Sequence, residues 1–440
     1  MLTPRPYVTA HDGHEAFSPR AFLEQSIEII ERQEPAVQAF VTLDLASARR
    51  QADESDARWK AGRQRSAIDG MPVGVKDIIF TRDMPTEMGS PLFKGWQPDD
   101  DAASVSALRE AGAVIVGKTV TTEFAATVPG PTRNPHDHSR TPGGSSSGSA
   151  AAVGCGMLSG ALGTQVVGSI LRPASYCGCV GYKPSLGAIN RGGSLDFLSQ
   201  SVTGTIAASV SDAWALAKEI AGRVGGDPGS PGLIFSDAPL RAAKPKSILL
   251  LNPGANAVAE PSGAEILEVV RRLLEREGIA VTLGSATAEL RTLEETLTTA
   301  ITVTQEINAR ESVWPLNAYS ERDVTKLSPL MIGRLAQGRA IGGGLYREKL
   351  AQRQEARELF VRLARPFDAW LALSAAGPAP LGLESTGSPL FAVASSYLGV
   401  PAVNLPAGRA NGLPIGVQLI GFLNEDEALM AHAAWLEAKL

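Results

Sequence analysis

The sequence contains few histidine, cysteine and aromatic residues. Its 440 residues include five histidines and three cysteines, and aromatic residues make up 5% of the chain. Three cysteines cannot form a disulfide framework, and the odd number suits a reducing compartment. Cys177 and Cys179 are closer together than the usual zinc-binding pair and have no histidine nearby. We therefore expect buried free thiols and no metal site.

Positive charge and long apolar runs are also lacking. Subtracting 46 acidic from 41 basic side chains gives a net charge of −5, and no basic cluster stands out. Phosphate backbones and anionic membranes require a concentrated positive face, so we expect no nucleic-acid or membrane partner. No apolar run could cross a bilayer, and the first residues do not show the pattern of a secretory signal. The cytoplasm is the expected location.

The apolar fraction of 44% is ordinary for a globular protein and provides an ample core. Helical patterns cover residues 18–33, 45–60, 102–111, 149–158, 263–277, 286–310, 345–363 and 425–439. Strand patterns cover residues 71–80, 113–117, 247–251, 279–283, 369–373 and 414–420. This alternation is typical of α/β layering. Strands occur towards both ends and no linker is visible, so we predict one domain, residues 1–440, around one sheet.

Two glycine-flanked serines and an upstream lysine can open an acyl bond without histidine. Ser145 lies in a Gly/Ser run, Ser169 follows 24 positions later, and Lys76 lies in an apolar segment. A hydroxyl is a poor nucleophile until a neighbour takes its proton. A buried lysine could do so, because burial lowers the pKa of its ammonium group. A surface lysine is the alternative, which the apolar residues around Lys76 disfavour.

The Gly/Ser run of residues 143–149 leads directly into the small apolar segment 149–158. At the N-terminus of a buried helix, its free amides would favour negative charge. A flexible linker is the alternative, but linkers do not usually run into apolar segments. The run also satisfies the Gly-x-Ser-x-Gly elbow of the α/β-hydrolases. That elbow follows a hydrophobic strand, whereas residues 131–142 are polar and rich in proline, and the histidines are poorly placed.

Several motifs in order resemble the amidase signature family. They lie at residues 70–77, 111–119, 143–153, 168–178 and 412–420. Within the family, residues 85–90 and the Ile-Leu-Arg-Pro after Ser169 are most similar to malonamidase-like bacterial amidases. The resemblance implies a three-layer α/β/α amidase signature fold with a large twisted mixed sheet. It also implies a signature core at about 65–205 and a more variable helical region at about 225–365.

The resemblance implies the role of each catalytic residue. Ser169 would be the nucleophile, Ser145 a bridging serine in a cis peptide, and Lys76 the base. The oxyanion hole would be formed by the backbone amides of residues 166–169, which are Val166, Val167, Gly168 and Ser169. Threonine and glycine are usual where this sequence has the two valines. Because valine resists positive φ, the loop is distorted if Val167 must adopt it; otherwise the pocket wall becomes more apolar. The variant segment 199–204 is expected to affect loop anchoring or pocket shape.

We expect substrate contacts at Arg172, Met88, Gly144 and Ser146. The guanidinium of Arg172 suits a substrate carboxylate, and an equally weighted alternative is that it holds the serine loop by pairing with backbone carbonyls. An acidic, malonamic-type amide is expected if Arg172 faces the pocket. A larger apolar or aryl amide, or a carbamate (urethane), is expected if Met88 and the valines line it, and we lean towards this second class.

The resemblance thus implies hydrolysis of a carbon–nitrogen bond in a small non-peptide amide, with no cofactor and no metal. The partners would be the substrate and water, and the family allows a homodimer. Some members of the family instead supply ammonia to a partner enzyme or transamidate tRNA-bound substrates, and some relatives are scaffolds without catalysis. The presence of all three catalytic side chains disfavours the scaffold.

Overall fold

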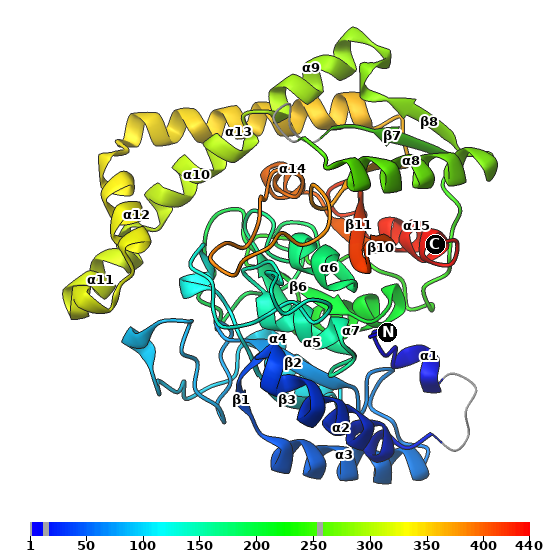
Figure 1. Cartoon of the computed structure of the whole chain (residues 1–440), viewed down its shortest axis with the longest axis vertical. Coiled ribbons are helices and arrows are strands. Elements are labelled where there is room, and N and C mark those ends of the chain that lie inside the picture. The colour runs from blue at the N-terminus through cyan, green and yellow to red at the C-terminus, as the bar shows by residue number, and fades with distance from the viewer. Residues whose placement is uncertain (1, 12–16, 253–257) are drawn as a thin grey trace.

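The computed structural model describes residues 2–11, 17–252 and 258–440. Within these ranges the strands form one mixed sheet of eleven strands, in the order β1-β3-β2-β4-β6-β5-β10-β11-β9-β7-β8 (Figure 1). The strands are β1 (Phe40–Leu43), β2 (Pro72–Lys76), β3 (Val114–Thr119), β4 (Gly160–Gln165), β5 (Val180–Lys183), β6 (Val202–Ala207), β7 (Ser247–Leu250), β8 (Ala280–Leu283), β9 (Ala369–Leu373), β10 (Ala402–Ala410) and β11 (Leu413–Ile420).

The two ends of the sequence meet in this sheet. Strands β1 to β6 form one side, with β2 parallel to both β3 and β4. Strands β7, β8 and β9 form the other side and are parallel to one another. The antiparallel pair β10 and β11 lies between β5 and β9 and joins the two sides. The expectation of a large mixed sheet fed from both ends is confirmed.

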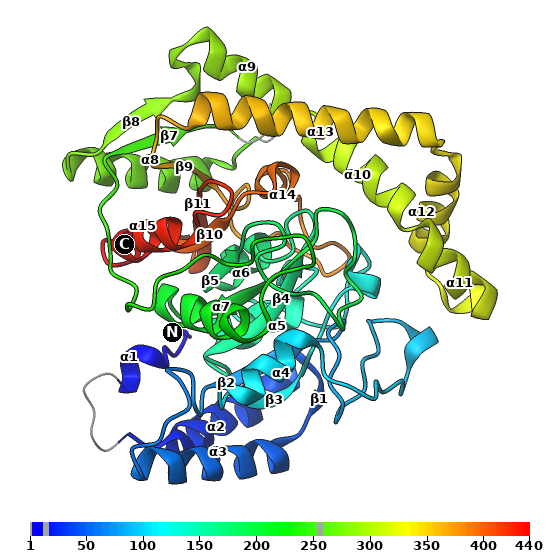
Figure 2. The same ribbon diagram turned by 180° about the vertical axis from the view of Figure 1, so that it is seen from behind.

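Helices cover both faces of the sheet, which gives three layers (Figures 1 and 2). One face carries α4 (Ala103–Glu110), α7 (Val210–Val224), α8 (Pro261–Arg276) and α15 (Asp426–Glu437). The other carries α2 (Pro19–Val37), α3 (Leu45–Lys60), α5 (Ser147–Gly154), α6 (Leu171–Cys177) and α14 (Val393–Leu398). The short α1 (Val8–His11) contacts α7.

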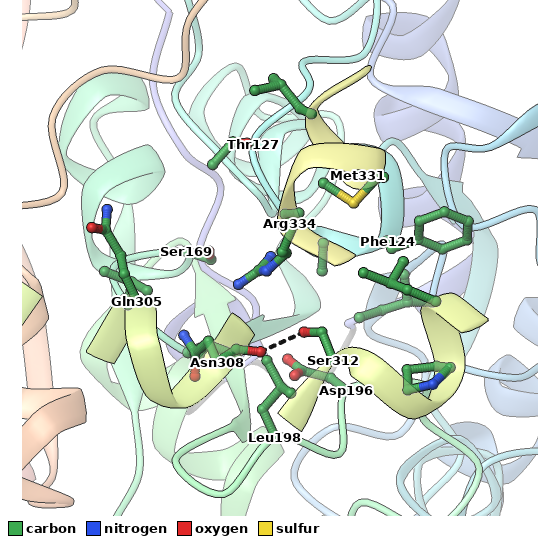
Figure 3. A pocket seen from close by; sticks show the side chains of 18 of the residues that line it. Phe124, Thr127, Ser169, Asp196, Leu198, Gln305, Asn308, Ser312, Met331 and Arg334 are labelled. Carbon is green, nitrogen blue, oxygen red and sulfur yellow. Dashed lines mark hydrogen bonds between the residues drawn. The ribbon is translucent and has the colours of Figure 1, made fainter. Parts of the chain in front are cut away.

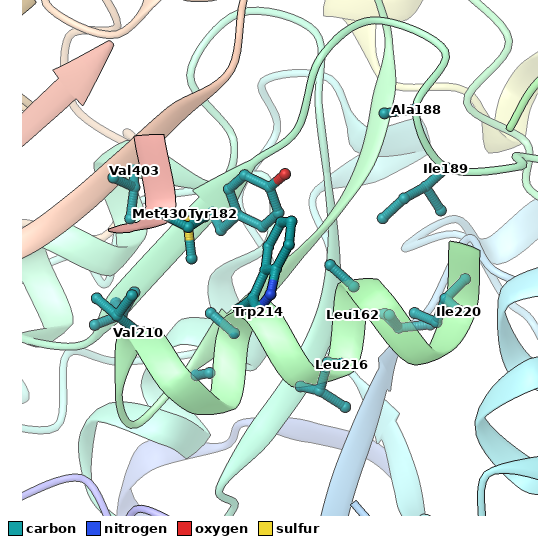
Figure 4. Close-up of a cluster of buried hydrophobic side chains, with 14 of the residues drawn as sticks. Leu162, Tyr182, Ala188, Ile189, Val210, Trp214, Leu216, Ile220, Val403 and Met430 are labelled. Carbon is teal, nitrogen blue, oxygen red and sulfur yellow. The ribbon is translucent and has the colours of Figure 1, made fainter. Parts of the chain in front are cut away.

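The core beneath α7 shows how one face is sealed. Trp214 and Val210 of α7 lie over Leu162 of β4 and Tyr182 of β5, and Met430 of α15 completes the cluster (Figure 4). All five side chains are buried. Burying an aliphatic or aromatic side chain of this size stabilises the fold by about 1.5–3 kcal/mol relative to exposure. The helix layer is therefore fixed to the strands that carry the site.

Local signals explain where α2 begins and ends. Ser18 Oγ accepts a hydrogen bond from the amide of Ala21, and Pro19 occupies the first helical position. The helix is terminated by the C-cap residue Gln38, whose φ is 53° in the left-handed region. The predicted start is thus correct, but the helix runs to Val37 rather than to about residue 33.

Five helices form an arm that extends beyond the sheet and turns back beside the core (Figures 1 and 2). They are α9 (Ala288–Leu297), α10 (Ala300–Glu311), α11 (Val313–Asp323), α12 (Pro329–Ala340) and α13 (Gly343–Ala364). The prediction of one helix over residues 286–310 is wrong, because it is divided into α9 and α10. The hydroxyls of Thr298 and Thr299, at the break, bond to the carbonyls of Glu295 and Thr296. Such local bonds compete with a continuous helix.

Candidate active site

Lys76 is the last residue of β2 and is completely buried. Strands β2 and β4 are parallel neighbours with Val75 opposite Leu162, so the end of β4 lies beside Lys76. The Nζ atom of Lys76 lies 2.7 Å from Ser145 Oγ and 2.8 Å from Thr164 Oγ1. Two of the three predicted catalytic residues are therefore in direct contact.

Burial controls the proton affinity of Lys76. Loss of water around the ammonium lowers the pKa of Lys76 to about 7, and the negative charge of Asp196 opposes that shift. A substantial fraction of the amine is thus neutral near neutral pH. A neutral amine at hydrogen-bond distance from a hydroxyl can accept its proton.

The serine run is fixed by hydrogen bonds at almost every hydroxyl. The Gly144–Ser145 peptide bond is cis. Ser146 Oγ contacts the Thr164 backbone, and Ser147 Oγ donates to the carbonyl of Val120. Ser149 Oγ donates to the carbonyl of Leu162. The run is therefore the N-terminus of α5 bound to β4 and to the end of β3, and the flexible-linker alternative is wrong.

Ser169 lies on the loop between β4 and α6, where it is half-buried and lines a pocket. Its carbonyl accepts a hydrogen bond of 3.2 Å from the amide of Ser146, which ties this loop to the serine run. Its hydroxyl forms no hydrogen bond within the part of the chain that the structure describes. The contact of Lys76 with Ser145 is thus formed, whereas a hydrogen bond between Ser145 and Ser169 is not.

All four carbonyls of the loop 166–169 accept hydrogen bonds. The side chain of Gln200 donates to Val166 O at 2.8 Å, and Ser396 Oγ donates to Val167 O at 3.3 Å. The amide of Arg172 donates to Gly168 O, and the carbonyl of Ser169 is bound by Ser146 as described above. Every carbonyl dipole of the loop is therefore held.

The amides of the same four residues donate no hydrogen bond to any acceptor within residues 2–11, 17–252 and 258–440. Successive free N–H groups in a turn attract an anion. Val166 and Val167 are not among the residues with positive φ, so the two valines do not strain the loop. Gln165 stabilises it from below, because its Oε1 accepts from the amides of Ile170 and Leu171. The arrangement can hold an oxyanion.

Some residues that shape this loop were not identified from the sequence. Gln200 lies in the segment 199–204, where an effect on loop anchoring was expected, but no role was assigned to it. Gln165 and Ser396 bind each other at 3.0 Å although 231 positions separate them. Thr164, the second partner of Lys76, was also missed. A polar residue at the end of a small-residue segment was the only signal for Gln165 and Thr164.

The pocket in front of Ser169 has a volume of about 530 Å³. Loops of the core form one wall, and helices α10, α11 and α12 of the arm form the other (Figure 3). Apolar side chains dominate the wall, and they include Ile78, Phe124, Leu198, Leu316, Tyr319 and Met331. Polar groups that reach the pocket include Thr127, Asp196, Gln305, Asn308 and Arg334. A volume of this size suits a small organic molecule.

Arg172 both lines the pocket and holds the serine loop. One of its terminal nitrogens donates to the carbonyl of Gly144 at 2.7 Å and to Thr386 Oγ1 at 3.1 Å. Its Nε has no partner within the described ranges, and burial lowers the pKa of Arg172 to about 10. The guanidinium thus remains charged at neutral pH. The bond to Gly144 supports the interpretation that Arg172 holds the serine loop, and its place in the pocket lining leaves it available to a substrate.

The other expected substrate contacts differ in position. Met88 is buried, has a φ of 59° and lines the pocket, as do Val166 and Val167. Gly144 and Ser146 do not line it. The carbonyl of Gly144 is bound by Arg172 and the hydroxyl of Ser146 by β4. These two residues therefore support the serine loop from behind the pocket wall.

The described histidines and the cysteines do not line this pocket. The rings of His11, His136 and His432 each contact a backbone carbonyl, and His14 lies outside the described residues. The three cysteines are buried and unpaired. No group of metal-binding side chains occurs in the portion of the chain that the structure covers. Among the same residues, no helix is long and apolar enough to cross a membrane.

The chain matches known proteins along most of its length. The model of the Amidase family matches residues 21–430. The chain is 33% identical to a glutamyl-tRNA(Gln) amidotransferase subunit from Anaeromyxobacter sp. (strain K), over 97% of this chain and 94% of that protein.

Solved structures are similar over nearly the whole chain. A structure described as an amidase superposes with a TM-score of 0.84 at 29% identity, covering 99% of this chain and 100% of the other. The peptide amidase from Stenotrophomonas maltophilia superposes with a TM-score of 0.75 at 26% identity, covering 98% and 95% respectively. The similarity therefore includes the arm as well as the core.

Proposed function

Because this chain belongs to the amidase family, whose members act on carbon–nitrogen bonds, we propose that it hydrolyses a small non-peptide amide through an acyl-enzyme on Ser169. The observation that carries the proposal is the 2.7 Å contact between the buried amine of Lys76 and Ser145 Oγ. This contact lies beside the loop 166–169, whose amides are free and which lines a pocket large enough for a small organic molecule.

In the proposed reaction, neutral Lys76 accepts the proton of Ser145 as Ser145 accepts that of Ser169. Ser169 Oγ then attacks the substrate carbonyl and forms a carbon–oxygen bond. When the tetrahedral intermediate collapses, the carbon–nitrogen bond breaks and the proton returns through Ser145 to the departing amine. Water attacks the acyl-enzyme by the same route and releases the acid. The hydrogen bond between Ser145 and Ser169 is expected to form with substrate bound, since catalytic contacts tighten in the Michaelis complex.

We propose that the free amides of residues 166–169 stabilise the negative oxygen of the tetrahedral intermediate. Loss of one such donor costs an enzyme about 2.7–4 kcal/mol of transition-state stabilisation. Gln200 and Ser396 act as positioning residues, because they hold the carbonyls of Val166 and Val167. Arg172 acts in the same way on the serine loop, through the carbonyl of Gly144.

We propose an apolar or aryl substrate body, in either an amide or a carbamate. The support is the pocket wall, in which Phe124, Leu198 and Met331 face the space in front of Ser169 (Figure 3). An aryl group can pack against these side chains without leaving a polar group unpaired. Aryl amides and aryl carbamates therefore belong in the first hydrolysis panel.

The second candidate is a subunit that supplies ammonia to a partner enzyme. It is favoured by the similarity to a glutamyl-tRNA(Gln) amidotransferase subunit. Such a protein would release ammonia from a donor amide and depend on partner proteins for its activity. If the purified chain turns over simple amides alone, with rates unaffected by candidate partners, this alternative is excluded.

The experiment that tests the main proposal is hydrolysis of para-nitroanilides by the purified chain and by Ser169→Ala. We expect the variant to lose at least about 1,000-fold in kcat, since relay members act as a unit. Ser159→Ala is the matched control, because Ser159 Oγ is buried without a partner in the described chain and lies away from the pocket. Full activity in Ser169→Ala would refute the acyl-enzyme on this residue.

A further inference from the structure

Arg334 is a cation in the pocket without a hydrogen-bond acceptor among the described residues. It lies on α12, and its guanidinium projects into the pocket towards Ser169 and Asn308 (Figure 3). The side chain is half-buried. It forms no hydrogen bond and no ion pair with any residue that the structure describes. Its electrostatic partner is Asp196, which attracts it from beyond ion-pair distance.

Other arginines that the fold withdraws from water have acceptors. Arg353 donates to Ser199 Oγ and to Gln200 Oε1, and Arg357 donates to the carbonyl of Tyr397. Arg172 donates to Gly144 O and Thr386. Arg334 is also withdrawn from water, since burial lowers its pKa, but no acceptor among the described residues compensates. Keeping a guanidinium partly desolvated and unpaired costs free energy that a bound anion would recover.

The charge balance of the pocket also favours an anion. Among its lining residues, the charged ones are Arg172, Arg334 and Asp196. Asp196 accepts a hydrogen bond from Ser201 through Oδ1, and its Oδ2 has no partner in the described chain. Lys76 is largely neutral when it acts as a base. Two cations face one anion, so a ligand with a single negative charge neutralises the pocket.

We propose that Arg334 binds a carboxylate carried by the substrate at a distance from the scissile bond, so that the enzyme selects monoanionic amides. The inference rests on the proposed function and assigns the substrate class of the same pocket. The apolar wall contacts the body of the substrate, and Arg334 of the arm supplies the positive charge that binds its carboxylate. Arg334 is therefore a specificity-determining residue that acts on substrate binding.

Matched substrate pairs test this proposal. One pair is the mono-para-nitroanilide of succinic acid and the corresponding methyl ketone, in which a methyl group replaces the acidic hydroxyl. A second pair carries the carboxylate on the amine part, as N-acetyl-para-aminobenzoate and the corresponding aryl methyl ketone. The wild type should prefer the acid in at least one pair. The preference is measured as the ratio of kcat/KM values for acid and ketone.

Arg334→Met should reduce that ratio by about 10- to 100-fold, as expected for loss of a hydrogen bond to a charged group. The reduced ratio should result from a higher KM for the acid. The kcat for the acid and the kcat/KM for the methyl ketone should change little. Arg334→Lys should recover part of the ratio. Arg339→Met is the matched control on the same helix, because Arg339 is exposed, lies outside the pocket and bonds to Asn317. It should leave the ratio unchanged.

Binding separates this inference from the proposed function. In the Ser169→Ala background, calorimetry with the same acids and ketones reports affinity without turnover, and Arg334→Met should weaken acid binding alone. The role of Arg334 would be overturned if Arg334→Met weakened the binding of acids and ketones equally. It would also be overturned if the wild type preferred the acid in neither pair. If the wild type cleaves none of the amides while Arg334 still governs acid binding, the proposed reaction fails and the anion site stands.

Discussion

Three lysines are completely buried, and their partners differ. Lys118 forms an ion pair with Asp77 and bonds to Thr86, and Lys183 donates to the carbonyl of Pro184. Burial lowers the pKa of Lys118 to about 8 and that of Lys183 to about 7. Lys76 differs because its partners are the hydroxyls of a serine and a threonine beside the pocket. Neither burial nor a hydroxyl partner alone identifies a base, because Lys118 has both. We propose Lys76 because, among the described residues, it bonds to hydroxyls alone and one of them belongs to the serine run.

The pH dependence of kcat/KM should follow the proton on Lys76. The amine is a base only when deprotonated, so activity should be present above its pKa of about 7 and lost as pH falls below it. Asp196 raises that pKa, so Asp196→Asn should move the midpoint of the acid limb to lower pH. The measurement is kcat/KM from pH 5 to 10 for both proteins, a range that brackets the pKa of Lys76 of about 7.

Asp237→Asn, at an exposed surface position, should leave that midpoint in place. An unmoved or raised midpoint in Asp196→Asn would argue against Lys76 as the titrating base.

At the scale of elements, α5 positions the serine run through close packing. All eight of its residues are buried, and the helix approaches the chain around Ala39 and Val120. A Cβ atom on Gly148 would lie 2.1 Å from the carbonyl oxygen of Ala39 and 2.4 Å from the amide of Val120. The absence of a side chain at Gly148 thus permits the contact that places Ser145 beside Lys76.

Gly148→Ala should therefore destabilise the protein by about 1–3 kcal/mol or more, because backbone atoms must move to admit the methyl group. The matched control is Gly222→Ala on α7, where an added Cβ would lie 3.5 Å from Phe235. That change should stabilise by about 0.4–1 kcal/mol. Thermal unfolding midpoints of both variants and the wild type provide the measurement. Equal midpoints for the two variants would contradict the packing argument.

Elements with their own local signals could be predicted from the sequence. The cap at Ser18 and the apolar run at residues 369–373 are examples. Strands β4 and β6 were missed. Both are buried throughout, so neither shows the alternation of a half-buried strand, and glycine interrupts both segments. Helix α6 was missed because Pro173 and the flanking glycines imitate a loop.

The candidate site divides in the same way. Lys76, Ser145 and Ser169 carry motifs that are visible along the chain. Arg334 and Asp196 have no such motif, because they reach the pocket only through tertiary packing. Their positions follow from where the arm and the segment before β6 lie in space, which short-range sequence patterns do not specify.

At the scale of the molecule, the arm and the core share the pocket through aromatic contacts. Tyr319 of α11 stacks on Phe124 of the core, with ring centroids 4.9 Å apart and an angle of 26° between the planes. It also meets the ring of Phe93 edge to face at 5.1 Å. The guanidinium of Arg322 lies over the ring of Phe93 as well, 5.0 Å from its centroid. These contacts fix the helices that form the outer wall.

Tyr319→Ala should loosen the arm without unfolding the core. Each aromatic pair contributes about 0.5–1.5 kcal/mol beyond burial, so amide hydrogen exchange in α11 and α12 should become faster. The KM of the variant for aryl substrates should rise, because the wall that contacts them would be less firmly fixed than in the wild type. Ile332→Ala, an exposed position on α12, is the control and should change neither. Unchanged exchange in Tyr319→Ala would show that other contacts hold the arm.

The central place of β10 and β11 bears on how the protein is made. These two strands are the last of the sheet to leave the ribosome, and without them β5 and β9 remain open edges of two separate partial sheets. Unpaired edges invite wrong association with other chains. Ser396, which holds the carbonyl of Val167, emerges just before them. A nascent chain therefore lacks the bond that holds the carbonyl of Val167 until Ser396 has been made, so the proposed oxyanion loop is completed late in the assembly of the sheet.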